Sequence, residues 1–420
     1  MTESNKIPKH WQVKKLSDIG EIVSGGTPST KVSDYWDGNI SWISPADLSG
    51  YSNTTITKGR KSITKEGLKN SSARLIPKGS VLFSSRAPIG YVVIAGNEVC
   101  TNQGFKSIVP NKLITTDYLF FYLKASKQKA EKVASGTTFK EISLKAFSIL
   151  ELPLPPLPEQ QAIVSKIEEL FSELDHGIAQ LKTAKQQLKV YRQSLLKWAF
   201  EGKLTNKKVK DGELPKGWKW TTINEIGKTK GGKRLPPKHQ YAEETTDFVY
   251  IMAGNLKDGT IKNKPTYLNE ETYNALHNYK VTGGEVYITI VGACIGDAGV
   301  IPDNIGKSIL TENAAKIIEL KDVHNKFLSR WINSFNCQLQ IKRKILSATL
   351  GKLALNRIGT LELPLPPLKE QLLIVDELES KLTVCDEIEE TISQSLQQAE
   401  TLRQSILKKA FEGKLVKTKP

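Results

Sequence analysis

Two long stretches of the chain carry apolar residues at steps of three and four, separated by polar residues. This spacing is typical of a helix with one apolar stripe and, sustained over several heptads, of a coiled coil. Two consecutive steps of four, from Leu170 to Ile178, indicate a stutter. The stripes comprise Ile163, Ile167, Leu170, Leu174, Ile178, Leu181, Leu188, Leu195 and Ala199 in the first stretch, and Ile374, Leu378, Leu382, Cys385, Ile392, Leu396, Ala399, Ile406 and Ala410 in the second.

The two stretches are copies of one segment. Residues 152–160 (LPLPPLPEQ) return as 363–371 (LPLPPLKEQ), and residues 199–204 (AFEGKL) return as 410–415, both at an offset of 211. The prolines favour an extended entry, and Pro158 suits the first turn of a helix. Gly202 stands where a helix-ending glycine belongs. We therefore expect a helix of about 65 Å in each copy.

A single helix of this length cannot bury its own apolar stripe. We expect the two stripes to pack against each other, and the pattern alone allows either direction of packing. The alternative is that each helix lies with its stripe on its own domain, since a heptad stripe can also face a core.

The segments between the copies alternate predicted strands with one helix, which indicates mixed α/β modules. The predicted elements are strands at 40–43, 81–85 and 91–95 and a helix at 117–133 in the first module, and strands at 248–251 and 286–291 and a helix at 327–346 in the second.

The modules also resemble each other weakly. Residues 7–11 (IPKHW) match 214–218 (LPKGW), Gly25-Gly26 matches Gly231-Gly232, and residues 88–90 match 294–296. The chain is therefore predicted to be an internal duplication with an approximate two-fold axis. We also expect the paired glycines to let the backbone approach a phosphate closely.

Positive charge is concentrated in the two modules. The net charge of +16 divides into +9 for residues 1–151, +1 for 152–204, +8 for 205–362 and −2 for 363–420. Basic modules on neutral helices favour polyanion binding, although a lysine-rich surface without such a partner gives the same balance.

Composition and motifs argue against a membrane protein or a self-sufficient enzyme. No apolar run approaches the length of a membrane span, and the first residues lack the apolar core of a secretory signal. The cysteines (Cys100, Cys294, Cys337 and Cys385) form no metal-binding or disulfide pattern, so we expect reduced thiols in a cytoplasmic protein. The histidines show no paired spacing, and the near miss to a phosphate loop at 306–308 lacks its first glycine. No Pro-Pro pair is followed by an aromatic, as an amino-methyltransferase of nucleic acid needs.

The duplicated segment resembles the conserved regions of specificity (S) subunits of type I restriction–modification systems. The order of segments is also similar: target-recognition domain 1 at 1–151, a proline-led long helix at 152–204, target-recognition domain 2 at 205–362 and a second such helix at 363–420. The first module resembles the family at 25–29 (GGTPS), 84–90 (SSRAPIG) and 102–105 (NQGF), whereas the second departs from those strings.

The resemblance implies an α+β fold whose two recognition domains are separated by long helices packed as an antiparallel coiled coil. It further implies that each domain reads one half of a bipartite, asymmetric duplex DNA target and that this subunit is not catalytic. Its expected partners are double-stranded DNA, two modification subunits that bind S-adenosylmethionine and methylate adenine, and two restriction subunits that use ATP and Mg²⁺. No cofactor is expected in this chain.

Residues that read DNA should be Lys and Arg for phosphates, with Arg, Asn and hydroxyl side chains for base edges. Trp11 and Trp218 are predicted as core anchors, whereas base stacking by Trp36 stays open. The candidate DNA-binding residues lie in loop-like positions and are Thr27, Ser29, Lys31, Arg60, Lys61, Ser85, Arg86, Thr138, Lys140, Lys230, Lys233, Arg234, Lys238, His239, Asn255 and Lys257.

Two other functions stay open from the sequence. A free-standing bivalent nucleic-acid regulator would bind without enzymatic partners, and an enzyme with unrecognised catalytic residues would methylate or cleave DNA alone.

Overall fold

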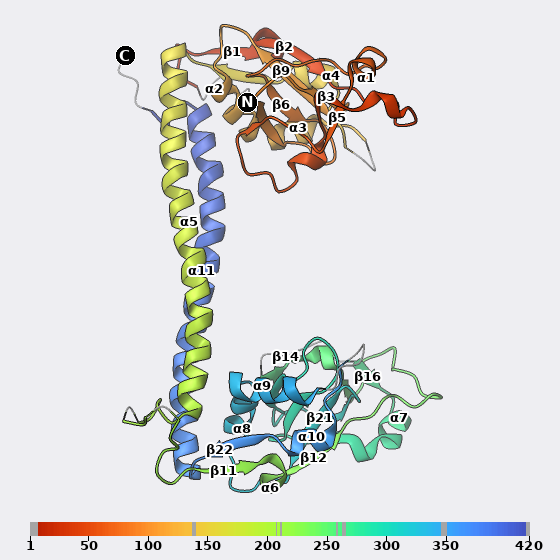
Figure 1. Cartoon of the computed structure of the whole chain (residues 1–420), viewed down its shortest axis with the longest axis vertical. Coiled ribbons are helices and arrows are strands. Elements are labelled where there is room, and N and C mark those ends of the chain that lie inside the picture. Colours follow the sequence, from red (N-terminus) through yellow and green to blue (C-terminus); the bar gives the residue numbers. More distant parts are fainter. Residues whose placement is uncertain are drawn as a thin grey trace. The chain divides into compact units, whose positions relative to one another are not determined.

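The structure is a computed structural model, and it describes residues 7–136, 140–206, 208–210, 212–257, 259–262, 266–345 and 351–416. The chain divides into two compact units. One unit combines Met1–Leu181 with Gln394–Pro420, and the other comprises Lys182–Ser393. Each unit therefore contains one module and a part of both long helices, whose course is traced in Figure 1.

The first module contains two small sheets. Its strands are β2 (Gly20–Ser24), β3 (Trp36–Ile43), β4 (Thr55–Ile56), β5 (Lys61–Ile63), β6 (Val81–Ser84), β7 (Val92–Ala95), β8 (Cys100–Thr101) and β9 (Phe105–Pro110). One sheet has the order β2-β9-β6-β7-β4, and the other has the order β5-β3-β8. Strands β6 and β7 are buried on both faces, which explains why they read as continuous apolar runs. The three predicted strands of this module correspond to β3, β6 and β7.

The predicted helix at 117–133 is two helices. The helices of the module are α1 (Lys65–Lys69), α2 (Thr116–Ala125), α3 (Lys127–Val133) and α4 (Leu144–Ser148). Ser126 separates α2 from α3, and its hydroxyl donates to the Tyr122 carbonyl at 2.8 Å. A serine that satisfies a nearby carbonyl competes with helix continuation, and apolar periodicity cannot reveal such a break.

The second module repeats this plan with a longer second sheet. Its strands are β12 (Lys228–Gly231), β13 (Phe248–Ile251), β14 (Leu256–Lys257), β15 (Thr260–Ile261), β16 (Thr266–Leu268), β17 (Lys280–Val281), β18 (Val286–Thr289), β19 (Ala298–Val300), β20 (Lys307–Leu310) and β21 (Ala314–Ile318). They form sheets of order β12-β21-β18-β19 and β16-β13-β20-β17 and a small β14-β15 pair. The predicted strands at 248–251 and 286–291 correspond to β13 and β18.

The helices of the second module are α6 (Ile223–Ile226), α7 (Glu270–Ala275), α8 (Asn325–Ile332), α9 (Phe335–Lys344) and α10 (Leu355–Gly359). The predicted helix at 327–346 is thus also divided. Ser334 caps α9 by accepting from the Cys337 amide, and it ends the preceding segment.

Each proline-rich motif forms a short strand before a long helix. Strand β10 (Glu151–Leu154) pairs with β1 (Gln12–Lys15), and β22 (Glu362–Leu365) pairs with β11 (Lys219–Thr222). The helices that follow are α5 (Leu157–Phe200) and α11 (Leu368–Phe411). Both end at a glycine of positive φ, Gly202 at 72° and Gly413 at 68°, which is the backbone state that glycine adopts without strain.

The glutamine of each motif clamps its helix to its module. Gln160 is fully buried; its Oε1 accepts from the Thr115 amide at 2.8 Å, and its Nε2 donates to the carbonyls of Leu113 and Pro155. In the second copy, the buried Gln371 makes the same three bonds to the His324 amide and to the carbonyls of Asp322 and Pro366. The clamp joins the start of each long helix to the loop that precedes α2 or α8.

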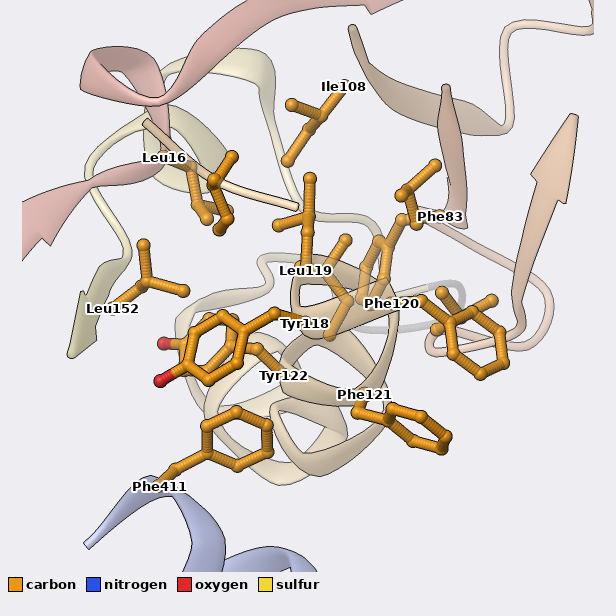
Figure 2. Packing of buried hydrophobic residues seen from close by; sticks show 14 of the residues in the cluster. Leu16, Phe83, Ile108, Tyr118, Leu119, Phe120, Phe121, Tyr122, Leu152 and Phe411 are labelled. Carbon is orange, nitrogen blue, oxygen red and sulfur yellow. The ribbon is translucent and has the colours of Figure 1, made fainter. Parts of the chain in front are cut away.

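The far end of each long helix packs on the module that belongs to the other copy. Phe411 of α11 contacts Tyr118 and Tyr122 of α2, with ring centroids 5.3 Å apart in both pairs (Figure 2). In the second unit, Phe200 of α5 contacts Phe327 of α8 at 5.3 Å. The phenylalanine of the repeated AFEGKL motif therefore completes a module core in each unit.

Trp11 and Trp218 lie in these cores, as predicted, with 6% and 8% of their surface exposed. The prolines near them contact the helix ends, since a Cβ added to Gly413 would meet Pro8 and one added to Gly202 would meet Pro215.

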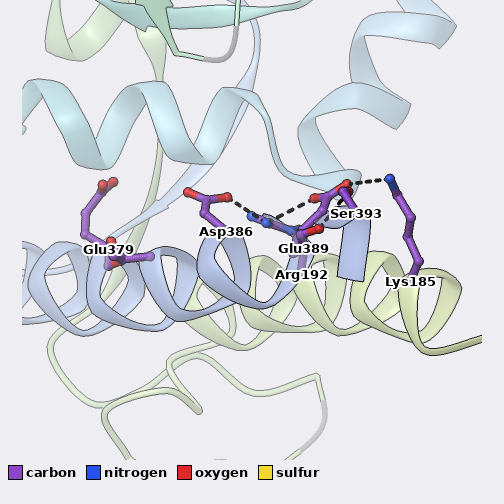
Figure 3. A network of polar contacts seen from close by, with 7 residues as sticks. Lys185, Arg192, Glu379, Asp386, Glu389 and Ser393 are labelled. Carbon is purple, nitrogen blue, oxygen red and sulfur yellow. Dashed lines mark hydrogen bonds and ion pairs between the residues drawn. The ribbon is translucent and has the colours of Figure 1, made fainter. Parts of the chain in front are cut away.

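Within each unit, charged side chains join the two long helices. Arg192 of α5 lies 2.6 Å from Asp386 and 3.3 Å from Glu389 of α11, and Lys185 lies 3.5 Å from Glu389 (Figure 3). In the first unit, Arg403 of α11 forms an ion pair with Asp175 and lies over the Phe171 ring of α5. Every residue of the two predicted apolar stripes is buried or half-buried.

The structure aligns the glycine pair of one module with that of the other, but shifted by one residue from the alignment predicted from the sequence. The Gly25 amide donates to the Phe105 carbonyl and the Gly232 amide to the Ala314 carbonyl, so Gly25 corresponds to Gly232. A Cβ on either glycine would lie 1.9 or 2.0 Å from the carbonyl oxygen of Asn102 or Thr311. The protein's own backbone thus excludes a side chain here, and the expected phosphate approach is not needed to explain the glycines.

Among the described residues, no helix is both long and apolar enough to cross a membrane.

The glutamine clamp generates a stability prediction. Gln160→Ala removes three buried hydrogen bonds. The backbone groups that made these bonds lose the glutamine as a partner, so we expect a loss of about 2–4 kcal/mol in the free energy of unfolding. Gln161→Ala, at the exposed neighbouring position, is the matched control and should change this free energy by less than about 0.5 kcal/mol. Denaturant unfolding of both variants measures the difference, and equal stability of the two would contradict the clamp.

Candidate nucleic-acid interface

Thr27 and Gln103 form a polar corner of the first module, in which Thr27 is half-buried and Gln103 is exposed. The Thr27 hydroxyl donates to Gln103 Oε1. Directly beneath, the buried Trp42 donates from Nε1 to the Gly26 carbonyl at 2.9 Å, which fixes the backbone that carries Thr27. Sequence reasoning selected Thr27 but missed Gln103, because 76 residues separate the two and no local pattern joins them.

Arg86 lies next to this corner in a three-residue charge cluster. Its Nη1 lies 3.4 Å from Glu141 Oε2, and Lys106 Nζ lies 3.8 Å from Glu141 Oε1. Only 8% of the Lys106 side chain is exposed. Burial lowers the pKa of Lys106, the Glu141 carboxylate opposes that shift, and Arg86 adds to it. Glu141 therefore compensates two cations and holds Arg86 at a defined place on the surface.

Two further candidates of the first module, Ser29 and Lys61, contact Trp36. The indole Nε1 of Trp36 donates to the Ser29 carbonyl at 3.1 Å, and Lys61 Nζ lies 5.2 Å from the ring centroid. Arg60 Nε lies 3.7 Å from Asp47 Oδ1. Lys31 and Lys140 are exposed. Trp36 also contacts Trp42 edge-on at 5.2 Å, which connects this group to the Thr27 corner.

Among the described candidates of the first module, Ser85 is not brought to this surface. Ser85 is fully buried, its backbone bridges Gly104 and Ile142, and its hydroxyl has no hydrogen-bond partner among the described residues. A buried hydroxyl cannot reach a base edge in this conformation, so the expectation for Ser85 is not supported. Thr138 lies outside the described residues.

In the second module, Arg234 and Glu312 form the corresponding exposed pair. Arg234 Nε lies 2.8 Å from Glu312 Oε1, with 80% and 30% of the side chains exposed. Tyr250 lies beneath, and its hydroxyl donates to the Lys233 carbonyl at 2.8 Å. Burial raises the pKa of Tyr250 to about 12, so this hydroxyl keeps its proton and acts as a donor at neutral pH. Glu312, like Gln103, was missed by sequence reasoning.

The other candidates of the second module differ in their surroundings. Lys233 Nζ lies 6.0 Å from the Tyr279 ring centroid, and the half-buried His239 contacts the Thr272 hydroxyl through Nδ1 at 2.9 Å. The further lysine candidates are exposed, and these are Lys230, Lys238 and Lys257.

Asn255 is engaged in the fold. Its Oδ1 accepts from the Met252 amide at 2.9 Å, and its Nδ2 donates to the Lys262 carbonyl at 3.3 Å. Asp47 has the same role in the first module, where it accepts from the Ser44 amide at 2.8 Å. The asparagine therefore caps its own turn, and base reading by Asn255 would break those bonds.

The described residues offer little for catalysis. No group of three His, Cys, Asp or Glu side chains among them could hold a metal ion. The cysteines are free; burial raises the pKa of Cys100 to about 11 and that of Cys337 well above its usual value. These two thiols are therefore protonated at neutral pH and are poor nucleophiles.

The chain matches one protein family twice. The family described as "Type I restriction modification DNA specificity domain" matches residues 8–183 and again residues 215–398. The matched segments cover most of both modules and most of both long helices.

Relatives of known name are similar to large parts of the chain. The MjaIX specificity subunit of a type I restriction enzyme from Methanocaldococcus jannaschii is 36% identical over 67% of this chain and 65% of its own length. The chain thus aligns with just under two thirds of that relative. The EcoKI specificity subunit of Escherichia coli is 23% identical over 98% of this chain and 90% of its own length.

Solved structures are similar in fold. The HsdS subunit of Thermoanaerobacter tengcongensis gives a TM-score of 0.61 at 19% identity, covering 97% of this chain and 98% of that one. A chain solved in work on complex assembly and conformational transition of the type I R-M system gives 0.76 at 19% identity, covering 97% and 99%.

The charge cluster around Glu141 generates a second stability prediction. Glu141→Gln leaves the buried Lys106 ammonium without its counter-charge, and we expect a loss of about 1–2 kcal/mol, less than for a fully buried pair because Glu141 is partly exposed. Glu131→Gln, in an exposed pair with Lys127, is the control and should be nearly neutral. Lys106→Met in the Glu141→Gln background should restore stability, and a double-mutant cycle from urea unfolding would detect the coupling. Additive effects would contradict it.

Proposed function

Because the chain belongs to the family of type I restriction–modification DNA specificity proteins, we propose that it reads a bipartite, asymmetric DNA target with its two modules. Members of this family recognise DNA sequence and are not enzymes. In the proposal, target-recognition domains at 1–151 and 205–362 each read one half of the target. The long conserved segments at 152–204 and 363–420 set the spacing between the halves.

The observation that carries the proposal is one backbone frame built twice with unlike polar side chains. In both modules a buried aromatic residue donates to the same carbonyl, from Trp42 to Gly26 and from Tyr250 to Lys233. The polar pair above it is Thr27–Gln103 in one module and Arg234–Glu312 in the other. Two modules that share a backbone arrangement but present different hydrogen-bond donors and acceptors can recognise different base sequences.

We also infer an internal duplication with pseudo-two-fold symmetry. Each module is clamped to the start of its own long helix by Gln160 or Gln371, and it receives the end of the other long helix through Phe411 or Phe200. This reciprocal arrangement is expected when two copies of one unit exchange helix ends.

The long helices are proposed to form an antiparallel coiled coil. In the second unit Arg192 contacts Asp386, whereas the earlier residue Lys185 contacts the later residue Glu389. An earlier residue of α5 thus contacts a later residue of α11, which supports opposite directions of the two helices. The buried and half-buried stripes supply the apolar seam.

The DNA-binding surface is proposed to consist of the candidate residues that are accessible. Arginines and hydroxyl groups near the two corners would contact base edges, and exposed lysines would contact phosphates. The proposed contacts are Thr27, Ser29, Lys31, Arg60, Lys61, Arg86, Lys140, Lys230, Lys233, Arg234, Lys238, His239 and Lys257. Thr138 stays a prediction from the sequence.

The proposal includes partner subunits that carry the chemistry. Two modification subunits would supply S-adenosylmethionine and adenine methylation, two restriction subunits would supply ATP-dependent cleavage, and the complex would work in the cytoplasm. The alternative, a free-standing bivalent nucleic-acid regulator, explains the basic modules but gives no reason for family membership.

Co-expression with the methyltransferase subunit of a type I system tests the scaffold role. We expect a stable complex that methylates adenine in a split motif, while the purified chain alone has no methylation or cleavage activity. A chain that binds DNA tightly but never retains the subunit would favour the regulator, and activity of the isolated chain would favour an enzyme.

Arg86 provides a residue-level test of DNA reading. If Arg86 makes a bidentate guanine contact, Arg86→Ala should weaken binding by about 1–3 kcal/mol and relax specificity at one position. Arg74→Ala, which removes an arginine paired with Glu21 in the same module, is the matched control and should leave specificity unchanged. Competition binding with single-base variants of the target measures both. Equal weakening on all sequences, with a salt slope reduced by about one, would mark a phosphate contact instead.

A further inference from the structure

The Thr27–Gln103 and Arg234–Glu312 pairs occupy the same position in the two modules. The Gly26 amide donates to the Thr101 carbonyl and the Lys233 amide to the Leu310 carbonyl, at 2.8 and 2.9 Å. Thr27 and Arg234 directly follow Gly26 and Lys233. Gln103 and Glu312 lie two residues after Thr101 and Leu310, so the two pairs occupy equivalent positions. Both segments are therefore held by the same backbone bonds, and only the side chains above them differ.

The pair in the second module is rigidly supported from below. Glu312 Oε2 lies 3.3 Å from the Tyr250 hydroxyl and 3.2 Å from the Thr311 hydroxyl. Partial burial raises the pKa of Glu312, but hydrogen bonds, chiefly from Arg234, outweigh this effect and hold it below the usual value. The carboxylate is therefore ionised at neutral pH, and it presents acceptors beside a guanidinium that is 80% exposed.

These side chains match the edges of different base pairs. An arginine donates to O6 and N7 of guanine, and a carboxylate accepts from N4 of cytosine, so Arg234 and Glu312 together match a G·C pair. A glutamine bonds N6 and N7 of adenine, and a threonine methyl contacts the thymine methyl, so Thr27 and Gln103 match an A·T pair.

We propose that this shared position determines specificity in both modules: Arg234 and Glu312 select a G·C pair in one half of the target, and Thr27 and Gln103 select an A·T pair in the other. The inference rests on the proposed function and deepens it, because it assigns a base pair to named side chains and adds Gln103 and Glu312 to the reading surface.

The exposed ion pair of Lys228 and Glu319 in the second module has no polar counterpart in the first module. Lys228 Nζ lies 2.6 Å from Glu319 Oε2, and both side chains are exposed. The strand registers place Glu21 and Pro110 at the corresponding positions of the first module, so no polar pair recurs there. The position of Thr27–Gln103 and Arg234–Glu312 differs from it, because a polar pair above a buried aromatic residue recurs there in both modules.

A swap of the two pairs tests the inference in the complex with the methyltransferase subunit. The variant R234T/E312Q gives the second module the pair of the first, and mapping of methylated adenines should show one base pair of one half-target changing from G·C to A·T. The other half-target should stay the same. On oligonucleotides, the preference at this base pair should reverse by about 5- to 150-fold. The reciprocal variant T27R/Q103E should convert one A·T pair to G·C in the other half.

The control K228T/E319Q removes the same charges from the same module and should leave the motif unaltered. If the swapped variants assemble and methylate the parental motif, the specificity assignment is overturned while the proposed function stands. If the parental complex methylates no defined motif, the proposed function itself fails. A swapped variant that does not assemble is replaced by the single changes Arg234→Thr and Glu312→Gln, each of which should relax the same base pair; retention of the G·C preference in both would also overturn the assignment.

Discussion

The structure depends on burial of two apolar stripes that neither long helix can bury alone. Each helix of 44 residues carries an apolar stripe, and the hydrogen bonds within a single helix do not compensate for exposing that stripe to water. Within each unit, the ends of both stripes join one module core. The Gln160 and Gln371 clamps fix where each helix starts, and Phe411 and Phe200 fix where each one ends. The modules are thereby attached to rigid elements at two points.

This attachment separates the residues that must stay constant from those that are free to vary. The clamp, the aromatic ends and the glycines that touch backbone carbonyls all serve packing, and a change in any of them would disturb a core. The corner side chains belong to none of the apolar cores, so their replacement leaves the packing of the modules intact. A protein that changes its DNA target without changing its assembly needs this division, and it explains why the two ends of the repeated segment are nearly identical in both copies whereas the modules differ.

The sequence revealed the features that depend on local pattern and left out those that depend on contacts. The long helices, their extended entries and the central strands follow from apolar periodicity and proline placement, whereas the pairing of those entries as strands β10 and β22 does not. The breaks at Ser126 and Ser334 do not, because each depends on one hydroxyl bond within an otherwise helical pattern. Gln103 and Glu312 could not be found either, since their partners lie 76 and 78 residues away. The burial of Ser85 and the capping role of Asn255 likewise appear only in three dimensions.

The candidate arginines share an electrostatic property that bears on discrimination. Arg60, Arg86 and Arg234 each lie within 3.7 Å of a carboxylate, from Asp47, Glu141 and Glu312. A paired arginine gains little from a phosphate, because the new contact replaces an existing one or shares it with an anion that repels the backbone. It gains more where a guanine edge offers two acceptors in the plane of the guanidinium. In the proposed function, exposed lysines would then supply the affinity common to all sequences, and the arginines would contribute chiefly where the base is correct, which would raise specificity without raising non-specific binding.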